Sequence, residues 1–300
     1  MEGELQPAGG QTIGVLDARS DRFTADVVAR LADFPVAFLS YSACGVPITG
    51  QYGVVIDRLS FRFPYLLEVV KALSLDGTYV VNNPFSAGLT NKLVDMKVCT
   101  RLGLPVPKTV VLPRAEGCEE TDGAVGPIVW DRLGTDIGFP CILKPYDGYA
   151  WEDVYVAGSV DELRSLHEAL RHRPILLAQQ IIKYRDYYRV FCIDKKDVLF
   201  VKWLPKPGAM GEYLLTDLKA TEGIGERLAG LTKQLNRALD LDINVVEWCF
   251  DQEGQAWVID AFNEVPDIRP ESLPPEYYEW LVDRFAACVR DNAINARRNK

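Results

Sequence analysis

Two carboxylates on one face of an apolar β-hairpin constrain this chain more than any other feature of its sequence. The segment Ile243–Phe250 is an apolar strand that contains Glu247, and Gln255–Phe262 is a second apolar strand that contains Asp260. A four-residue hairpin loop would place Glu247 opposite Val258 and diagonally next to Asp260, roughly 7–8 Å away between Cα atoms. Two acids this close on an apolar face are costly unless a cation lies between them.

Mg²⁺ is the cation that this pattern favours. An amide side chain, Asn263, follows Asp260 by three residues. Proteins bind Mg²⁺ through one or two carboxylates and a few other oxygen atoms, often together with the phosphates of a substrate. The hairpin therefore predicts a magnesium site with two carboxylates and an amide oxygen, in which phosphate groups complete the octahedron.

The composition limits the classes of partner. Three hundred residues, 48% hydrophobic and 25% charged, suffice for two closely joined domains or three small lobes. A net charge of −9 argues against a broad nucleic-acid surface, and no apolar run approaches the ~18 residues of a membrane span. Seven scattered cysteines without a C-x-x-C pair favour reduced thiols and a cytoplasmic location. Residues 1–11 are polar, lack an apolar signal region and are predicted to be a flexible tail.

Strand and helix signals alternate along residues 12–88, which predicts a small lobe built on a parallel sheet. The apolar runs in this lobe predict strands at 12–16, 35–39, 52–56 and 79–81, and helices at 23–32 and 64–73. The rest of the chain has strand signals at 139–144, 154–157, 175–182, 188–194 and 198–202. Its helix signals lie at 86–102, 159–171, 226–239 and 276–290. A loop is expected at 113–138 and a charged turn at 183–186. The expected fold class is α/β, with a parallel-sheet N-terminal lobe followed by α+β lobes.

Three basic side chains are candidates for chemistry. Lys92 begins a predicted helix, Lys144 ends a predicted strand, and Arg189 lies inside another. Taken singly, each is better explained as a structural residue, such as a basic side chain that reaches solvent, than as a functional one. The chain has only two histidines, so a Ser-His-Asp mechanism is improbable, and no ligand set for structural zinc is present.

The order of these residues carries more information than any one of them. Along the chain come Lys92 with Gly103-Leu-Pro-Val-Pro107, Phe139-Pro-Cys-Ile-Leu-Lys144-Pro, Gln179-Gln180-Ile-Ile182, Asp186-Tyr-Tyr-Arg189-Val, and Glu247 followed by Asp260-x-x-Asn263. This series, from about Asn82 to Asp267, resembles the ATP-grasp superfamily, especially its glutathione synthetase and ribosomal-protein glutamate ligase-like branches. Residues 12–88 resemble the pre-ATP-grasp lobe. The resemblance implies an ATP-grasp domain at 89–300, with a central lid lobe at about 106–180 and a C-terminal lobe at about 181–300.

The resemblance also implies a role for each matched residue. Lys92 would contact an ATP phosphate, and Lys144 would bridge the α- and β-phosphates. Gln180, Ile181 and Ile182 would form the hinge that binds the adenine edge. Arg189 would lie near the transferring phosphate, which makes Arg189 and Lys144 the catalytic candidates. Glu247, Asp260 and Asn263 would bind Mg²⁺, with Mn²⁺ as an alternative metal.

A ligase is the function that this resemblance implies. A carboxylate would react with ATP to give an acyl-phosphate, which an amine or thiol then captures. The expected substrates are small molecules or short peptides, with neither nucleic acid nor membrane as a partner, and a homodimer is left open. Two alternatives remain: a small-molecule kinase of the same fold, and a nucleotide-binding module with little catalytic activity.

Three departures from the family pattern bear on the substrate or on the metal site. The phosphate-covering loop, residues 146–153, has one glycine and several acids, and it includes Trp151 as a candidate substrate contact. The segment 203–213 stands where the peptide-ligase branch has an arginine-containing, glycine-ended substrate loop. One extra residue separates Asp260 from Asn263, which predicts a β-bulge or a share of the metal binding for Glu264.

Overall fold

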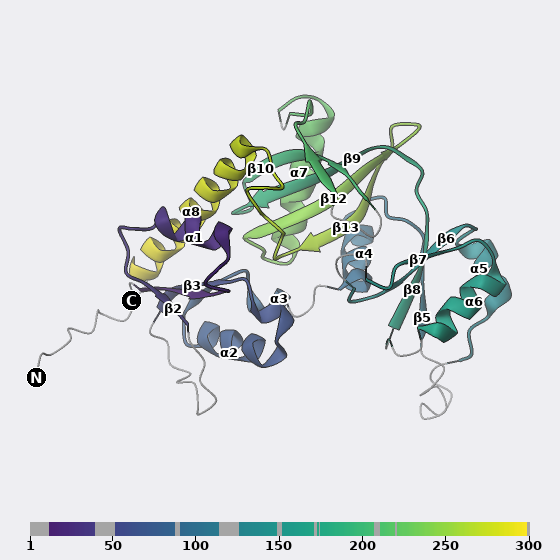
Figure 1. The fold of residues 1–300 in the computed structure, drawn as a ribbon, viewed down its shortest axis with the longest axis horizontal. Helices are drawn as coiled ribbons and strands as arrows, with labels where there is room; N and C mark the ends of the chain where they lie inside the picture. The colour runs from purple at the N-terminus through teal and green to yellow at the C-terminus, as the bar shows by residue number, and fades with distance from the viewer. Residues whose placement is uncertain are drawn as a thin grey trace, which may run out of the picture.

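Three β-sheets lie along the long axis of the molecule (Figure 1). The computed structural model describes residues 12–39, 52–87, 91–113, 126–148, 152–170, 173, 175–206, 211–219 and 221–298. The predicted N-terminal tail and Trp151 lie outside these residues. Among the helices of the described part, none combines the length and the hydrophobicity that crossing a membrane requires.

The first sheet is parallel, as the alternating pattern predicts. Its strands are β1 (Thr12–Leu16), β2 (Val36–Phe38), β3 (Tyr52–Asp57) and β4 (Tyr79–Val81), in the order β2-β1-β3-β4. The helices of this lobe are α1 (Arg22–Ala29), the 3₁₀ turn η1 (Ser60–Arg62), α2 (Pro64–Leu75) and α3 (Pro84–Ala87). Helix α2 begins with a proline at its first turn and buries Leu66, Val70 and Leu73 against the sheet.

The second sheet is antiparallel and contains two elements that the sequence does not predict. Its strands are β5 (Thr109–Pro113), β6 (Cys141–Pro145), β7 (Tyr155–Ala157) and β8 (Ile175–Gln180), in the order β5-β8-β6-β7, covered by α5 (Trp130–Asp136) and α6 (Val160–Ala169). Strand β5 was not predicted, and the loop predicted at 113–138 was wrong over α5. Trp130, Leu133 and Ile137 recur at helical spacing and pack on the sheet, and this burial outweighs the turn-rich composition around them.

The third sheet is antiparallel and carries the hairpin. Its strands are β9 (Tyr184–Ile193), β10 (Asp197–Leu204), β11 (Glu212–Leu214), β12 (Ile243–Asp251) and β13 (Ala256–Asn263), in the order β11-β10-β9-β12-β13. Helices α4 (Lys92–Arg101) and α7 (Ile224–Ala238) cover one face, and α8 (Pro275–Arg298) packs between this sheet and the parallel sheet. The turn predicted at 183–186 was wrong because β9 already begins at Tyr184.

The helix predicted at 86–102 is shorter than expected. Helix α3 ends at Ala87, residues 88–90 lie outside the described part of the chain, and α4 begins only at Lys92. The side chain of Asn91 accepts hydrogen bonds from the backbone N–H groups of Leu93 and Val94. This N-cap satisfies donors that the first turn of a helix leaves free and therefore fixes where α4 begins.

The register of the β12–β13 hairpin differs from the prediction. Glu247 lies directly opposite Asp260, and not opposite Val258 as expected. Asp251 and Gln255 close the turn with backbone and side-chain hydrogen bonds, which shifts the pairing by one residue. The register also shifts next to Glu247 on both sides, and the bulge predicted before Asn263 is present. The two acids are therefore closer neighbours than a regular hairpin would make them.

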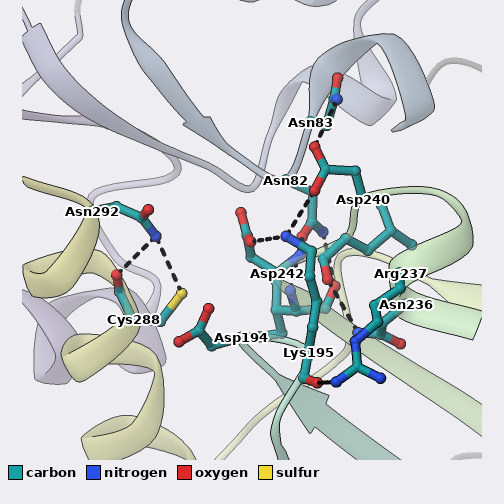
Figure 2. Close-up of polar contacts among 12 residues, drawn as sticks. Asn82, Asn83, Asp194, Lys195, Asn236, Arg237, Asp240, Asp242, Cys288 and Asn292 are labelled. Atoms are coloured by element: carbon teal, nitrogen blue, oxygen red, sulfur yellow. Dashed lines mark hydrogen bonds and ion pairs between the residues drawn. The ribbon is translucent and has the colours of Figure 1, made fainter. Parts of the chain in front are cut away.

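Asn82, which follows β4, joins the parallel sheet to the hairpin strands. Its amide oxygen accepts hydrogen bonds from the N–H groups of Asp242 (2.6 Å) and Ile243 (2.8 Å). Its amide nitrogen donates to the carbonyl oxygens of Ile243 (2.8 Å) and Glu264 (3.0 Å). Lys195 adds an ion pair to the Asp242 carboxylate at 2.8 Å, close to Asn82 (Figure 2). One buried side chain thus fixes the start of β12 and the end of β13.

We predict that Asn82→Ala lowers the free energy of unfolding by about 2–4 kcal/mol, because it leaves several buried backbone groups without partners. Urea denaturation measures this change. The neighbouring substitution Asn83→Ala is the matched control: it removes one side-chain contact to Asp240 and one local turn bond, so a loss of about 1 kcal/mol or less is expected. Equal losses for the two variants would contradict the conclusion that Asn82 fixes the start of β12 and the end of β13.

Candidate functional site

A small pocket lies where helix α4 faces strands β8, β6 and β13, and the sequence-predicted residues Lys92, Lys144 and Asp260 line it. Two further polar residues, Asp95 and Gln179, complete its polar side. The remaining wall is formed by Met96, Cys99, Val106, Val258, Ile259 and Ala261, which are mainly apolar. The pocket therefore has charged groups next to an apolar wall, which is the usual make-up of a small-molecule site.

Lys92 and Asp260 form an ion pair across the pocket. The Lys92 ammonium lies 2.7 Å from an Asp260 carboxylate oxygen, and the two side chains are 21% and 18% exposed. Burial opposes the charge of each group, but the pairing more than offsets it. The pKa of Lys92 is raised by Asp260, and the pKa of Asp260 is lowered by Lys92 and Lys144. Both groups are therefore charged at neutral pH.

Lys144 has no carboxylate partner of this kind among the described residues. It lies on β6, diagonally across from Gln179 on β8, and its ammonium donates a hydrogen bond of 2.8 Å to the Gln179 amide oxygen. Burial and, next, the nearby charge of Lys92 lower the pKa of Lys144 to about 8. A buried ammonium with a neutral partner and a like-charged neighbour gains from any anion that enters the pocket.

Arg189 holds the second carboxylate of the hairpin. Its guanidinium donates two hydrogen bonds to one Glu247 oxygen, at 2.9 and 2.7 Å, and the Tyr187 hydroxyl donates to the other oxygen. Burial opposes the charge of the guanidinium, but Glu247 and then Tyr213 raise the pKa of Arg189 above its usual value. Arg189 pairs with Glu247 because β9 lies beside β12 with these two residues in register.

Residues of the segment 203–213 contact the Arg189 guanidinium. The guanidinium lies over the Trp203 ring, 4.2 Å from its centroid, and donates a 2.7 Å hydrogen bond to the Tyr213 hydroxyl. A Cβ atom on Gly211 would lie 2.1 Å from the Trp203 ring, so only glycine permits this packing. Residues 207–210 lie outside the described part of the chain. The segment thus fixes the orientation of Arg189, a task that its sequence did not indicate.

Asn263 ends β13 next to the two acids. Its side-chain nitrogen donates to the Val245 carbonyl oxygen at 3.2 Å, so the amide oxygen of the same side chain points away from Val245. Its backbone N–H donates to the Asn244 side chain at 2.7 Å. The hairpin therefore presents two carboxylates and one amide oxygen at neighbouring positions. Each carboxylate is held by a protein cation, and this oxygen donor set fits a hard divalent cation such as Mg²⁺.

The predicted hinge connects the second and third sheets. Gln180 is the last residue of β8, and Ile181 and Ile182 lead into β9. The Gln180 side chain accepts a hydrogen bond from the Lys108 N–H at 3.2 Å, whereas the neighbouring Gln179 side chain faces Lys144. Successive residues of a strand point to opposite faces, so only one of the two glutamines can face the pocket.

Asp95 is a pocket residue that sequence reasoning missed. It lies one turn after Lys92 on α4 and is only 5% exposed, and its Oδ1 atom has no hydrogen-bond partner among the described residues. Burial and, next, the Asp260 carboxylate raise the pKa of Asp95 to about 9. The only signal in the sequence was the spacing of three residues from Lys92, which places both side chains on one helix face.

The acidic residues of the 146–153 loop have a partner of their own. Arg173 lies 2.6 Å from Asp153 and 3.0 Å from Glu152. Two negative charges of this loop are thus compensated by a neighbouring arginine. Residues 149–151 lie outside the described part of the chain.

A second group of possible metal ligands lies away from the pocket. Donor atoms of Asp194, Asp242 and Cys288 come within 4.8 Å of one another (Figure 2). Asp242 is already bound by Lys195 and by the Tyr79 hydroxyl, and burial raises the pKa of the Cys288 thiol far above neutral pH. This group is therefore explained as part of the contact between the parallel sheet and the third sheet.

Several solved structures are similar to this chain over nearly its whole length. A D-alanine–D-alanine ligase from Bacillus anthracis complexed with ATP matches with a TM-score of 0.67 and 15% identity, over 96% of this chain and 99% of that one. The ATP-grasp ligase PsnB complexed with a minimal precursor matches at 0.61 and 16%, over 92% and 99%.

A RimK domain ATP-grasp protein from Sphaerobacter thermophilus matches with a TM-score of 0.64 and 18% identity, over 93% of this chain and 99% of that one. No family model matches the sequence, and no curated protein matches it. The similarity is therefore one of architecture, and it extends over nearly the whole of each chain. The chain has the ATP-grasp fold, as the order of its sequence motifs indicates.

Proposed function

We propose that this protein is an ATP- and Mg²⁺-dependent ligase that joins a carboxylate to an amine or a thiol through an acyl-phosphate. The convergence of Lys92, Lys144 and Arg189 on the carboxylates of Glu247 and Asp260 carries this proposal. Three cations around two acids at the edge of a pocket suit a triphosphate with its metal ion.

Each side chain has a task in this proposal. Lys92 and Lys144 bind nucleotide phosphates, and the backbone at 180–182 binds the adenine edge beside the apolar wall of the pocket. Glu247, Asp260 and Asn263 hold Mg²⁺ or Mn²⁺, which, when bound, screens the triphosphate and stabilises the charge that develops during transfer. Arg189, fixed by Trp203 and Tyr213, directs its charge toward the transferring phosphate.

The reaction needs no nucleophile from the protein. An oxygen of the substrate carboxylate attacks the γ-phosphorus, and the bond to ADP breaks to leave an acyl-phosphate. The amine or thiol then attacks the acyl carbon, loses its proton and releases inorganic phosphate. The protein contributes positioning and charge neutralisation, which its rigidly held basic side chains can supply.

The acyl acceptor is a small molecule or a short peptide in this proposal. One structure of the ATP-grasp ligase PsnB is a complex with a precursor peptide, which makes a peptide one candidate class. A second candidate function, a nucleotide-binding module with little turnover, is favoured by one observation. Both hairpin acids are engaged by protein cations, and a protein that keeps them so would bind nucleotide without efficient transfer.

We predict that Asp260→Asn lowers the rate of ADP release by roughly a hundredfold or more, because the carboxylate is replaced by a neutral amide at the centre of the cationic cluster. The assay supplies ATP, Mg²⁺ and a broad panel of carboxylates with amines and thiols. Glu253→Gln, in the turn of the same hairpin, is the matched control and should retain wild-type activity. The ligase proposal fails if the wild-type protein releases no ADP with any pair and ATP does not raise its melting temperature.

We also predict that ADP affinity falls as the pH rises through about 8. Lys144 has a pKa of about 8 in the free protein, so it loses its positive charge above that pH. Phosphates favour the charged form, so binding takes up a proton there, and the affinity should fall by roughly tenfold between pH 7 and pH 9. Isothermal titration calorimetry in buffers of different ionisation enthalpy measures both effects. Lys144→Arg, which stays charged, should reduce the decrease to the part that the ionisation of Asp95, with its pKa of about 9, contributes, and an unchanged decrease would exclude Lys144 as a source.

A further inference from the structure

The ion pair between Lys92 and Asp260 cannot persist unchanged at a metal site. The Lys92 ammonium lies 2.7 Å from a carboxylate oxygen of Asp260, the residue proposed to bind Mg²⁺. A divalent cation on the same carboxylate would lie next to this ammonium, and the two positive charges would repel each other. The metal therefore weakens the hold of Asp260 on Lys92 and favours the transfer of Lys92 to another acid.

A second carboxylate is within reach of Lys92. Asp95 is three residues further along α4, so the Cβ atoms of the two residues are roughly 5–6 Å apart on one face of the helix. Both side chains line the same pocket. Asp95 is 95% buried, and its Oδ1 atom accepts no hydrogen bond in the described part of the chain. An unpartnered buried carboxylate oxygen is costly, so the position needs an explanation.

Lys92 is the cation that is best placed to bond the carboxyl group of Asp95. The alternative cation in the pocket, Lys144, is already bonded to Gln179 on the opposite wall. A lysine ammonium has three donors on a flexible stem, so Lys92 can bond Asp95 and a phosphate oxygen at the same time. Held by Asp95, the ammonium would stay in the pocket after it leaves Asp260.

We propose that Asp95 is a positioning residue that receives Lys92 from Asp260 when the metal-bound nucleotide enters the pocket. This inference rests on the proposed function, because it takes ATP and Mg²⁺ as the ligands. It assigns Asp95 no contact with the reacting atoms. It explains why an acid is buried in a pocket meant for an anion: Asp95 acts through Lys92 and fixes its direction toward the phosphates.

Calorimetric titration with ADP, with and without Mg²⁺, tests the exchange on the full chain. Asp95→Asn, which keeps the side-chain shape, should weaken binding of ADP with Mg²⁺ by about tenfold, since a hydrogen bond to the charged Lys92 ammonium is lost. Binding of ADP without Mg²⁺ should change by about twofold or less, because Lys92 then remains on Asp260. Asp95→Ser should behave in the same way, so the test does not depend on the folding of one variant. Asp76→Asn, an exposed change of the same charge after α2, should leave both affinities unchanged.

A double-mutant cycle separates positioning from structural support. In the Lys92→Met background, Asp95→Asn should cause no further loss of affinity, because the residue that Asp95 positions is gone. Equal weakening of ADP binding with and without Mg²⁺, or a full loss that persists in the Lys92→Met background, would overturn the inference. A wild-type protein that binds ADP no more tightly with Mg²⁺ would overturn the proposed function itself, and that result is distinct from any effect of Asp95.

Discussion

The neutralisation of two facing carboxylates is the constraint on which the site depends. Glu247 and Asp260 lie opposite each other on β12 and β13, and the protein places Arg189 on one and Lys92 on the other. Removing one partner of a buried ion pair leaves an uncompensated charge that costs about 3–5 kcal/mol. The strands β9, β12 and β13 and the helix α4 therefore have to assemble with these four side chains in register.

The rest of the fold can be understood as support for this assembly. Asn82 fixes the backbone at both ends of the hairpin strands, and α8 packs between the first and third sheets. The second sheet reaches the site through Lys144 and Gln179, and it is joined to the third by the short connection at 181–183. A short connection between two sheets that each have their own core is the usual arrangement of a hinge.

Sequence reasoning was accurate where a pattern extends over many residues. The hairpin and the parallel lobe could be predicted because apolar periodicity reports burial directly. The basic residues were recognised only through the resemblance of their order to the ATP-grasp motifs. The register was wrong because it depends on how Asp251 closes the turn, which hydrophobicity does not encode. Which of Gln179 and Gln180 faces the pocket depends on the phase of strand β8, because a shift of one residue would exchange the two faces. In the structure, Gln179 faces Lys144 in the pocket. Asp95 was missed because a single acid in a helix has no pattern of its own.

The ion pairs of the free protein also bear on the order in which ligands enter. In the proposed function, Lys92 and Arg189 compete with a metal ion for the Asp260 and Glu247 carboxylates, so Mg²⁺ that arrives alone has to displace protein cations without bringing a phosphate for them. A nucleotide removes this difficulty, since its phosphates can bind the displaced ammonium. Metal and nucleotide therefore favour each other's binding, and this coupling must be equal in both directions. The internal cations would thus make the proposed metal site selective for Mg²⁺ that arrives with a phosphate ligand.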